Sequence, residues 1–332
     1  MPRSKDKIKK EGFLPLTYLL FAAATLVTFG LCLSLGSVMV PISEWRTSQI
    51  ILGVRLPRVI CAGLVGALLS ISGASMQGLL KNPLADGTTL GVSAGASVGA
   101  VAAIVLGITI PGLPFAGTTV FASLFAFLSL AVILALSYRL DSGLSTDTII
   151  LIGVIFSMFA ASITSVLITY AGEKAKNIVH WTLGSLASQS YANMWLLLVS
   201  GAVFGGILLL HAKELNAFAV GEENARNVGV SVGRVKLTVL IAVSIQIGVC
   251  VSVSGSIGFV GLVVPHMVRM ITGPNHKRLL PGAIFGGAIF LMLCDLAART
   301  LFSPRELPIG VVTSLVGAVL FIRIFFAKRA AR

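Results

Sequence analysis

The sequence has 332 residues, of which 56% are hydrophobic and only 11% are charged. Soluble domains carry about 25% charged residues, so this composition excludes an ordinary soluble globular domain and indicates a polytopic membrane protein. The formal net charge of +13 does not indicate a nucleic-acid partner, because the basic residues are distributed as membrane topology requires.

A membrane-spanning helix needs roughly 20 mostly apolar residues, and the sequence contains ten such segments. They cover residues 14–35, 59–80, 90–108, 118–138, 148–170, 192–211, 236–254, 257–271, 281–301 and 309–327. The eighth segment is short and contains Pro265 and His266, so we expect a half-helix buried among its neighbours. The sequence therefore predicts an all-α protein of about ten transmembrane helices, forming a single domain over residues 1–332.

The distribution of positive charge predicts the orientation of these helices. When the basic tail at residues 1–13 is placed in the cytosol, most of the 25 lysines and arginines fall on the cytosolic side, as the positive-inside bias requires. The first apolar segment is too long for the core of a signal peptide, so we expect it to be retained. Because the number of spans is even, both termini are predicted to be cytosolic.

The segment at residues 211–236 is the longest charged interruption between two apolar blocks. Its centre predicts one or two short helices, which Gly221 and Gly229 punctuate. Glu222 and Arg226 lie one helical turn apart on one face. A simple turn is enough to connect two spans, so we interpret this cytosolic loop as a folded platform that docks a soluble partner.

Arginines gather at the opposite, outer side of the predicted bundle. Arg55 and Arg58 flank the start of the second span, where the helix dipole disfavours cations by a few tenths to about 1 kcal/mol. Anchoring to lipid phosphates is one explanation, and a cationic patch for an acidic partner is the other. Arg299, at the outer end of the ninth span, would join this patch, unless it pairs with Asp295 four residues earlier.

The second span carries small and polar residues at helical spacing: Gly63, Gly66, Ser70, Gly73 and Gln77. Small residues let helices pack closely in lipid, so a packing face is the favoured interpretation. A hydrated path lined by Ser70 and Gln77 is the alternative. The third span opens with a doubled small-residue pattern, which also predicts tight packing, at Gly91, Gly95 and Gly99.

Two short matches indicate an inverted repeat. Ser72 and Gly73 precede Pro83 by the same spacing as Ser254 and Gly255 precede Pro265. In the predicted topology the second span runs inward and the seventh runs outward. We therefore expect spans two to five to be related to spans seven to ten, as in many transporters.

The sequence contains no GxxxxGK[ST] phosphate loop, no HExxH motif and no GxSxG motif, so it predicts no catalytic residues. Four cysteines lie inside apolar blocks without a CxxC pair and are expected to be buried thiols. No metal site or cofactor is predicted. Asp295 is the only acidic residue that we place near the interior of a span, so a transporter of this kind must take its energy from a partner.

Six stretches together resemble the FecCD-type permeases, the membrane subunits of type II ABC importers for iron–siderophore, haem and cobalamin. They are RLPR at 55–58, ISGASMQGLLKNPLADGTTLGVSAGA at 71–96, WTLGSL at 181–186, GEENARNVGV at 221–230, GSIGFVGLVVPHMVR at 255–269 and ELPIGVVTSLVG at 306–317. The resemblance runs from the second span to the last. It implies a protein of the bacterial plasma (inner) membrane, surrounded by lipid.

The resemblance also implies partners: a second permease copy or a paralogue, two cytosolic ABC ATPase subunits, and an extracytoplasmic substrate-binding protein. The fifth and tenth spans would line the route at the dimer axis. The residues that couple this chain to the ATPase would be Glu222, Ala225, Arg226 and Gly229. Docking of the binding protein would fall on Arg55, Arg58 and Arg299. The cytosolic gate would lie near Asn82, Leu84, Thr146 and Asp147, where Asp147 departs from the small hydroxyl residue that the family predicts.

The cargo is predicted to cross as an intact complex, since no ring of Cys, His or carboxylate residues is present to strip a metal. Iron–siderophore is the leading cargo because it is the largest class within the family. Haem, cobalamin and molybdate are the alternatives. A secondary carrier that uses an ion gradient is the rival class, and a membrane anchor without transport is a third, less favoured one.

Overall fold

The computed structural model describes residues 15–36, 38, 40–87, 90–109 and 116–330, so the basic tail at residues 1–13 lies outside the described residues. The described chain is built from α-helices: α1 Pro15–Ser34, α2 Leu56–Leu79, α3 Val92–Leu106, α4 Ala116–Leu140, α5 Thr146–Thr169, α6 Ala175–Thr182, α7 Tyr191–Ser200, α8 Gly206–Leu210, α9 Ala212–Val220, α10 Glu222–Asn227, α11 Val232–Ser254, α12 Val260–Thr272, α13 His276–Thr300 and α14 Ile309–Ala330. Two π-helical turns, Ile50–Arg55 and Gly201–Gly205, extend α2 and join α7 to α8.

The ten predicted apolar segments correspond to ten helical units. Among the described residues, seven helices are long and apolar enough to cross a membrane, and three shorter apolar helices accompany them. The short ones are α3, α12 and the apolar part of α14, and α12 is the half-helix expected around Pro265. The prediction of an all-α polytopic membrane protein is confirmed.

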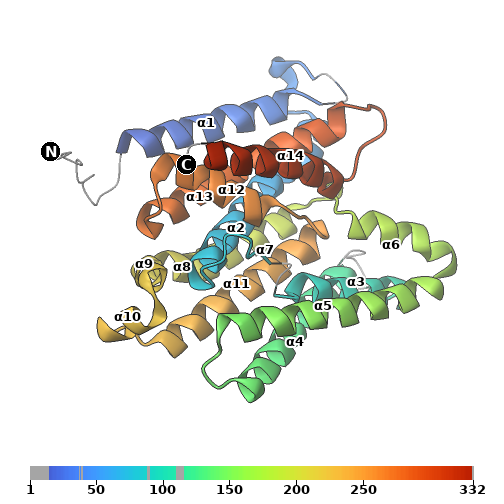
Figure 1. Cartoon of the computed structure of the whole chain (residues 1–332). Coiled ribbons are helices and arrows are strands. Elements are labelled where there is room, and N and C mark those ends of the chain that lie inside the picture. The colour runs from blue at the N-terminus through green and yellow to red at the C-terminus, as the bar shows by residue number, and fades with distance from the viewer. Residues whose placement is uncertain (1–14, 37, 39, 88–89, 110–115, 331–332) are drawn as a thin grey trace.

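Helices α2 and α11 form the centre of the bundle (Figure 1). Among the 18 residues of the apolar stretch of each helix, 83% are buried inside this chain in α2 and 72% in α11. The corresponding share is 17% in α1 and 22% in α5. The difference follows from composition, because the glycines and alanines of α2 allow neighbours to approach on every side, whereas α1 and α5 present long apolar side chains outward.

Close packing around α2 depends on glycine pairs. Gly73 lies against the backbone of Gly261 on α12, and Gly66 lies against the backbone of Gly287 on α13, with no room for a Cβ atom at either contact. Gly95 and Gly99 on α3 pack against α4 in the same way. The small residues at helical spacing therefore make helix interfaces, as predicted.

The helix contacts repeat between the two halves of the chain. Helix α3 packs on α4 and α5, and α12 packs on α13 and α14 in the same pattern. Helix α2 packs on α13, and its counterpart α11 packs on α4. Each helix of the first set thus has a corresponding helix in the second, which is the arrangement that an inverted repeat of spans two to five and seven to ten predicts.

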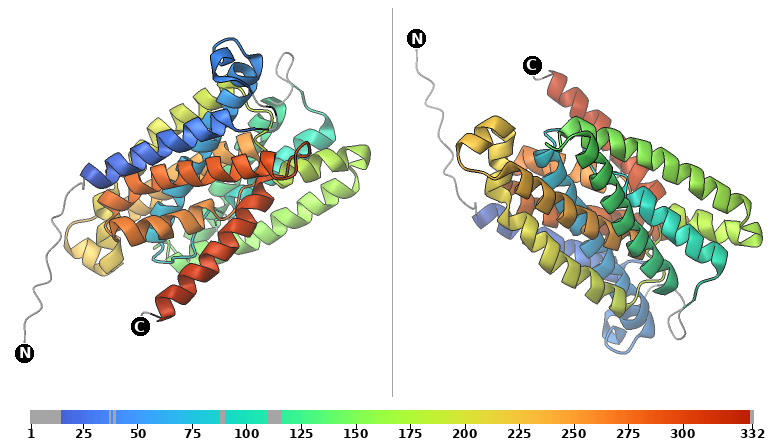
Figure 2. Two further views of the ribbon diagram at one scale, coloured as in Figure 1. Left: turned by 90° about the horizontal axis from the view of Figure 1, so that it is seen from above. Right: turned by 90° about the horizontal axis from the view of Figure 1, so that it is seen from below.

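The bundle has two distinct ends (Figures 1 and 2). Helices α9 and α10 lie at the end where α1 and α13 begin. The segment at 40–55 lies at the other end, where α1 and α13 finish. The platform and the arginines predicted from the sequence therefore lie at opposite ends of the molecule.

Candidate functional site

Helices α9 and α10 form the predicted platform, which we call the α9–α10 platform (residues 212–227). Leu215 and Phe218 are fully buried and anchor α9 on the bundle. Gly221 has a φ of 129° and separates the two helices, and Gly229 follows α10 with a φ of 88°. Only glycine adopts such angles without strain. The sequence predicts one or two short helices here, and the structure has two, separated and ended by these glycines.

The four predicted coupling residues do not all face outward. Arg226 and Gly229 are exposed, whereas the side chain of Ala225 is fully buried against the bundle. Ala225 can therefore support the platform but cannot itself contact a partner. The fourth residue, Glu222, is partly exposed and is held by a contact within the chain.

Glu222 pairs with Lys236 on α11, and its side chain is 26% exposed. Its Oε1 atom lies 2.9 Å from Nζ of Lys236, whose side chain is fully buried. The same ammonium donates a hydrogen bond of 2.9 Å to the carbonyl oxygen of Leu144. The carboxylate of Glu222 therefore neutralises a buried cation, and a role of Glu222 in coupling to an ATPase stays a prediction.

Hydrogen bonds of Asn216 hold α9 against the start of α13. The Oδ1 atom of Asn216 accepts a hydrogen bond of 2.8 Å from the backbone N–H of His276, and its Nδ2 atom donates one of 2.9 Å to Oδ1 of Asn275. Asn275 is also the N-cap of α13, accepting from the N–H of Lys277. The platform is thus fixed both to the start of α13 and, through Lys236, to the loop between α4 and α5.

The predicted gate residues lie on two loops. Asn82 folds its own turn, since its Oδ1 atom accepts a 2.9 Å hydrogen bond from the N–H of Leu84, and Leu84 is 52% exposed. Thr146 is the first residue of α5, and Asp147 next to it is exposed. Asn82 and Leu84 follow α2, whereas Thr146 and Asp147 follow α4, and their role as a gate stays a prediction.

Ser70 and Gln77 lie at contacts of α2 with other helices, and a role of these residues in a path stays a prediction. Ser70 is fully buried and packs against Gly287 on α13. The Nε2 atom of Gln77 donates to the carbonyl oxygens of Gly261 and Leu262, at 3.2 and 3.1 Å, and its Oε1 atom accepts from Arg269 at 3.1 Å. The packing interpretation is correct, because both polar groups lie at interfaces of α2 with other helices.

The three arginines expected to form an open cationic patch are buried: Arg55 is 5% exposed, Arg58 is 6% exposed and Arg299 is 4% exposed. Arg55 donates to the carbonyl oxygens of Leu33, Ser34 and Val38. The expectation of an exposed patch is therefore corrected, since the guanidinium groups have partners within the chain. A docking role for these residues stays a prediction.

Two carboxylates that are distant in sequence, those of Asp295 and Glu306, pair with Arg58. Its Nη2 atom lies 2.9 Å from Oδ1 of Asp295, and its Nη1 atom lies 2.9 Å from Oε2 of Glu306. Arg299 Nε lies 3.6 Å from Oδ2 of Asp295, so the expected pairing of these two residues is confirmed. We call Arg58, Asp295, Arg299 and Glu306 the ion cluster.

Charge within the ion cluster is balanced. Two guanidinium groups face two carboxylates, and Arg299 also donates to the carbonyl oxygen of Cys32. The side chain of Asp295 is 1% exposed, whereas that of Glu306 is 42% exposed. A buried ion pair is tolerated only when it is well paired and hydrogen-bonded, so Asp295 is the structural centre of the cluster and Glu306 is its accessible member.

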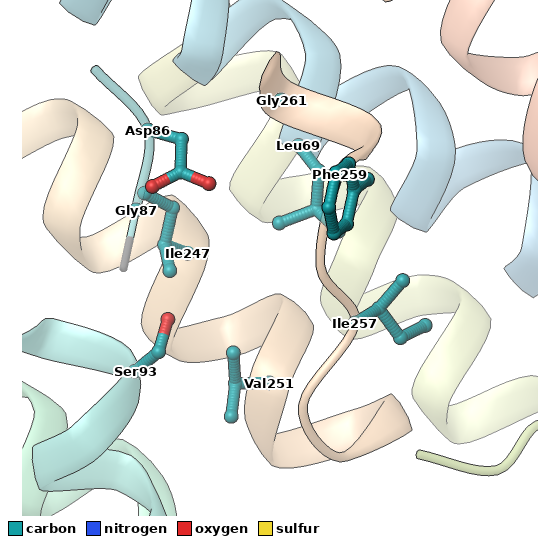
Figure 3. Close-up of a pocket in the computed structure, with 9 residues that line it drawn as sticks. All are labelled: Leu69, Asp86, Gly87, Ser93, Ile247, Val251, Ile257, Phe259 and Gly261. Carbon is teal, nitrogen blue, oxygen red and sulfur yellow. The ribbon is translucent and has the colours of Figure 1, made fainter. Parts of the chain in front are cut away.

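A small pocket lies among α2, α3, α11 and α12 (Figure 3). Leu69, Ile247 and Phe259 supply apolar walls, and Asp86 and Ser93 supply oxygen atoms. Asp86 and Phe259 stand on opposite sides of the space in Figure 3. Asp86, which follows α2 and is half-buried, is a lining residue of this pocket that has no signal of its own in the sequence.

The residues that the structure describes include no group of three or more His, Cys, Asp or Glu side chains with the geometry to hold a metal ion. The four cysteines are free and buried, at Cys32, Cys61, Cys250 and Cys294. Chemically, the described arrangement offers an exposed platform with mixed charge at one end and a closed ion cluster at the other.

Known proteins resemble this chain over most of its length. The model of the FecCD transport family matches residues 24–327. The chain is 45% identical over 274 residues to the ABC transporter permease protein YvrB of Bacillus subtilis, covering 82% of this chain and 78% of that protein. It is 37% identical over 278 residues to the cobalamin import system permease protein BtuC of Halobacterium salinarum, covering 83% of this chain and 73% of that protein.

A solved structure is similar as well. It is described as an inward-facing conformation of a metal-chelate type ABC transporter, and it superimposes with a TM-score of 0.85 at 31% identity, covering 94% of this chain and 99% of that one. Since the family model, the relatives and this structure each span most of the sequence, the chain belongs to the FecCD transport family.

Proposed function

We propose that this chain is the permease subunit of an ABC importer, in which it forms a dimer and provides the translocation path while separate ATPase subunits supply the energy. The observation that carries the proposal is the α9–α10 platform. It presents exposed charged residues, Glu223 and Arg226, on a scaffold with two internal anchors. Because the sequence has no phosphate-binding loop, such a platform is best explained as the docking site of an ATPase.

We further propose that the cargo is an intact metal complex with an organic ligand, with an iron–siderophore as the first candidate. Relatives named for cobalamin import and for metal-chelate transport support this class. A metal chelate can cross intact where no cluster of His, Cys, Asp or Glu side chains competes for its metal, and the described residues include none. Haem and molybdate are the further alternatives.

The end that carries the ion cluster is proposed to face the binding protein. Since Arg58 is buried and already paired, an acidic residue of the partner reaches it only if part of the cluster moves. Glu306 is the member that can leave, because its side chain is 42% exposed. Docking would then exchange one carboxylate for another at Arg58, which retains the charge balance.

The proposal is tested with the complex in nanodiscs. The chain is co-expressed with its candidate ATPase, and ATP hydrolysis is measured with and without a binding protein loaded with an iron–siderophore, haem or cobalamin. We expect the loaded protein to stimulate hydrolysis, and the most effective cargo identifies the substrate. Failure to assemble a complex from a correctly folded chain would overturn the proposal.

The rival function, a secondary carrier, predicts a different result. The purified chain alone in liposomes would then accumulate cargo under a proton or sodium gradient. The acids to replace in that case are Asp86, which lines the pocket of Figure 3, and Asp295, which is engaged by Arg58 and Arg299. Absence of gradient-driven uptake, together with stimulated ATP hydrolysis in the complex, distinguishes the importer from the carrier.

A further inference from the structure

Lys236 is the fully buried lysine at the start of α11, and its two contacts connect separate parts of the chain. Its side chain has no exposed surface, and its ammonium lies 2.9 Å from Glu222 on α10. It also lies 2.9 Å from the carbonyl oxygen of Leu144, 92 residues away. A buried ammonium is costly unless it is paired and hydrogen-bonded, so these two contacts are required for Lys236 to stay in place.

Leu144 belongs to a tightly folded loop between α4 and α5. The carboxylate of Asp141 accepts hydrogen bonds from the N–H groups of Gly143, at 2.8 Å, and Ser145, at 2.9 Å. The N–H of Leu144 donates to the carbonyl oxygen of Asp141 at 3.0 Å, and Leu144 has a φ of 50°. The loop is therefore folded by its own hydrogen bonds, and the predicted gate residues at 146–147 follow it directly.

The α9–α10 platform thus has two anchors that reach opposite groups of helices. Asn216 attaches α9 to α13 through His276. Lys236 attaches α10 to the loop between α4 and α5. The two groups are α3–α5 and α12–α14. Helices α3 and α4 pack on α11, whereas α12 and α13 pack on α2. The platform is therefore connected to one group through α9 and to the other through α10.

We propose that Lys236 is a positioning residue that transmits motion of α10 to the start of α5, and thereby couples ATP hydrolysis in the partner to movement of the gate. This inference rests on the proposed function. A charged link suits this task because a separated, buried ammonium is strongly disfavoured. The α10 helix and the α4–α5 loop consequently move together instead of sliding past each other, as an apolar contact would allow.

The first test measures ATP hydrolysed per cargo molecule transported in proteoliposomes that contain the complete transporter. Lys236→Met keeps the length of the side chain and removes its charge. We expect ATP hydrolysis to continue while the number of ATP molecules hydrolysed per cargo molecule rises by about fivefold or more. This is the factor that corresponds to a typical coupling energy between sites. Lys277→Met, which removes an exposed lysine at the start of α13, is the matched control and should leave the ratio unchanged.

The second test measures the link directly. Spin labels at Glu223→Cys and Ser142→Cys, both exposed positions, report the distance between α10 and the α4–α5 loop, while the four native cysteines are buried. We expect one narrow distance distribution in the chain with native Lys236 and a broad one in Lys236→Met. A distribution that is narrow and equal in both would overturn the proposal.

Glu222→Gln covers the case in which Lys236→Met does not fold. It leaves Lys236 bonded to Leu144 and removes the charge that holds α10, so it should also broaden the distribution. If the two residues act through one link, the double variant changes the transport ratio no more than Lys236→Met alone. Additive effects would overturn the link.

The distance measurement uses the chain alone in nanodiscs, so it does not depend on the proposed function. If the unaltered complex shows no stimulation by a loaded binding protein, the proposed function fails, whereas a narrow distribution that broadens in the variant still supports the link.

Discussion

The two charged ends of the molecule handle charge in opposite ways. In the ion cluster, Arg58, Asp295 and Arg299 are all buried, and each has a partner within the chain. On the α9–α10 platform, Arg226 is exposed to solvent, whereas Glu222 pairs with Lys236. Charges at the first end stabilise the fold of this chain, whereas the exposed charges at the second end are free to contribute to a contact with another protein.

This difference predicts which mutations affect folding and which affect assembly. Removing one member of a buried ion pair leaves an uncompensated charge. Removing an exposed charge away from any internal partner changes stability little. The ion cluster should therefore be sensitive in unfolding experiments, and the platform should be sensitive in binding experiments.

The largest effect is expected for Asp295→Ala, which leaves two buried guanidinium groups without their shared carboxylate. The free energy of unfolding should fall by roughly 3–5 kcal/mol, measured by denaturant titration in detergent micelles. Glu306→Ala is the control, because its side chain is 42% exposed, and it should cost about 1 kcal/mol or less. Equal losses in the two variants would contradict the view that Asp295 is the structural centre.

The helices and the platform could be predicted from the sequence because their signals are local. Ten hydrophobic segments predict the ten helical units, and Gly221 and Gly229 mark the ends of the short helices in the charged segment between two of these units. The small residues of α2 indicated packing, which the contacts of Gly66 and Gly73 bear out. In each case the residues that carry the signal lie within one segment.

The polar contacts could not be predicted because their partners are distant in sequence. Arg58 lies 237 residues from Asp295 and 248 residues from Glu306. The partner of Lys236 in the α4–α5 loop is the carbonyl oxygen of Leu144, an atom that every residue carries and that gives no signal in a sequence. The sequence therefore allows an exposed patch or lipid anchoring, whereas the fold buries the three arginines and pairs Arg58 and Arg299 with acids.

A smaller effect, on assembly, is expected for Arg226→Ala. Stability should change by no more than about 0.5 kcal/mol, because Arg226 is exposed. Affinity for the ATPase should fall by about 2 kcal/mol, roughly 30-fold, measured by titrating ATPase onto the chain in nanodiscs. Arg139→Ala, at the exposed end of α4, is the matched control. A loss of stability without a loss of affinity would assign Arg226 to the fold and remove the contrast between the two ends.

Docking at the other end should improve slightly when Glu306 is neutralised. Glu306→Gln replaces the carboxylate that pairs with Arg58 by a neutral amide. An acidic group of the binding protein then competes with a weaker partner for Arg58. The affinity should rise by at most about fivefold, since partly exposed ion pairs contribute about 1 kcal/mol or less, and the gain should shrink at high salt. Glu44→Gln removes an exposed acid from the same end and should have no effect of this size. A lower affinity in Glu306→Gln would show that Glu306 itself contacts the partner.

The smallest effect is expected in the loop that receives the bond from Lys236. Hydrogen bonds from Ser145 and Gly143 hold the pKa of Asp141 below its usual range. A carboxylate whose pKa is lowered by folding contributes stability above its unfolded pKa, about 3.9, and loses it as the pH falls through the lower folded value. The loop should therefore keep its conformation at neutral pH and loosen only in strong acid.

This transition can be followed with a spin label at Ser142→Cys in the loop. Mobility of the label should increase as the pH falls below about 3.9, and the same label combined with Asp141→Asn should show no such transition, because the amide carries no titrating charge. An identical acid transition in both proteins would assign the pH dependence to another group. A transition well above the ordinary pKa of an aspartate would contradict the direction of the shift, since it would mean that folding disfavours the ionised form of Asp141.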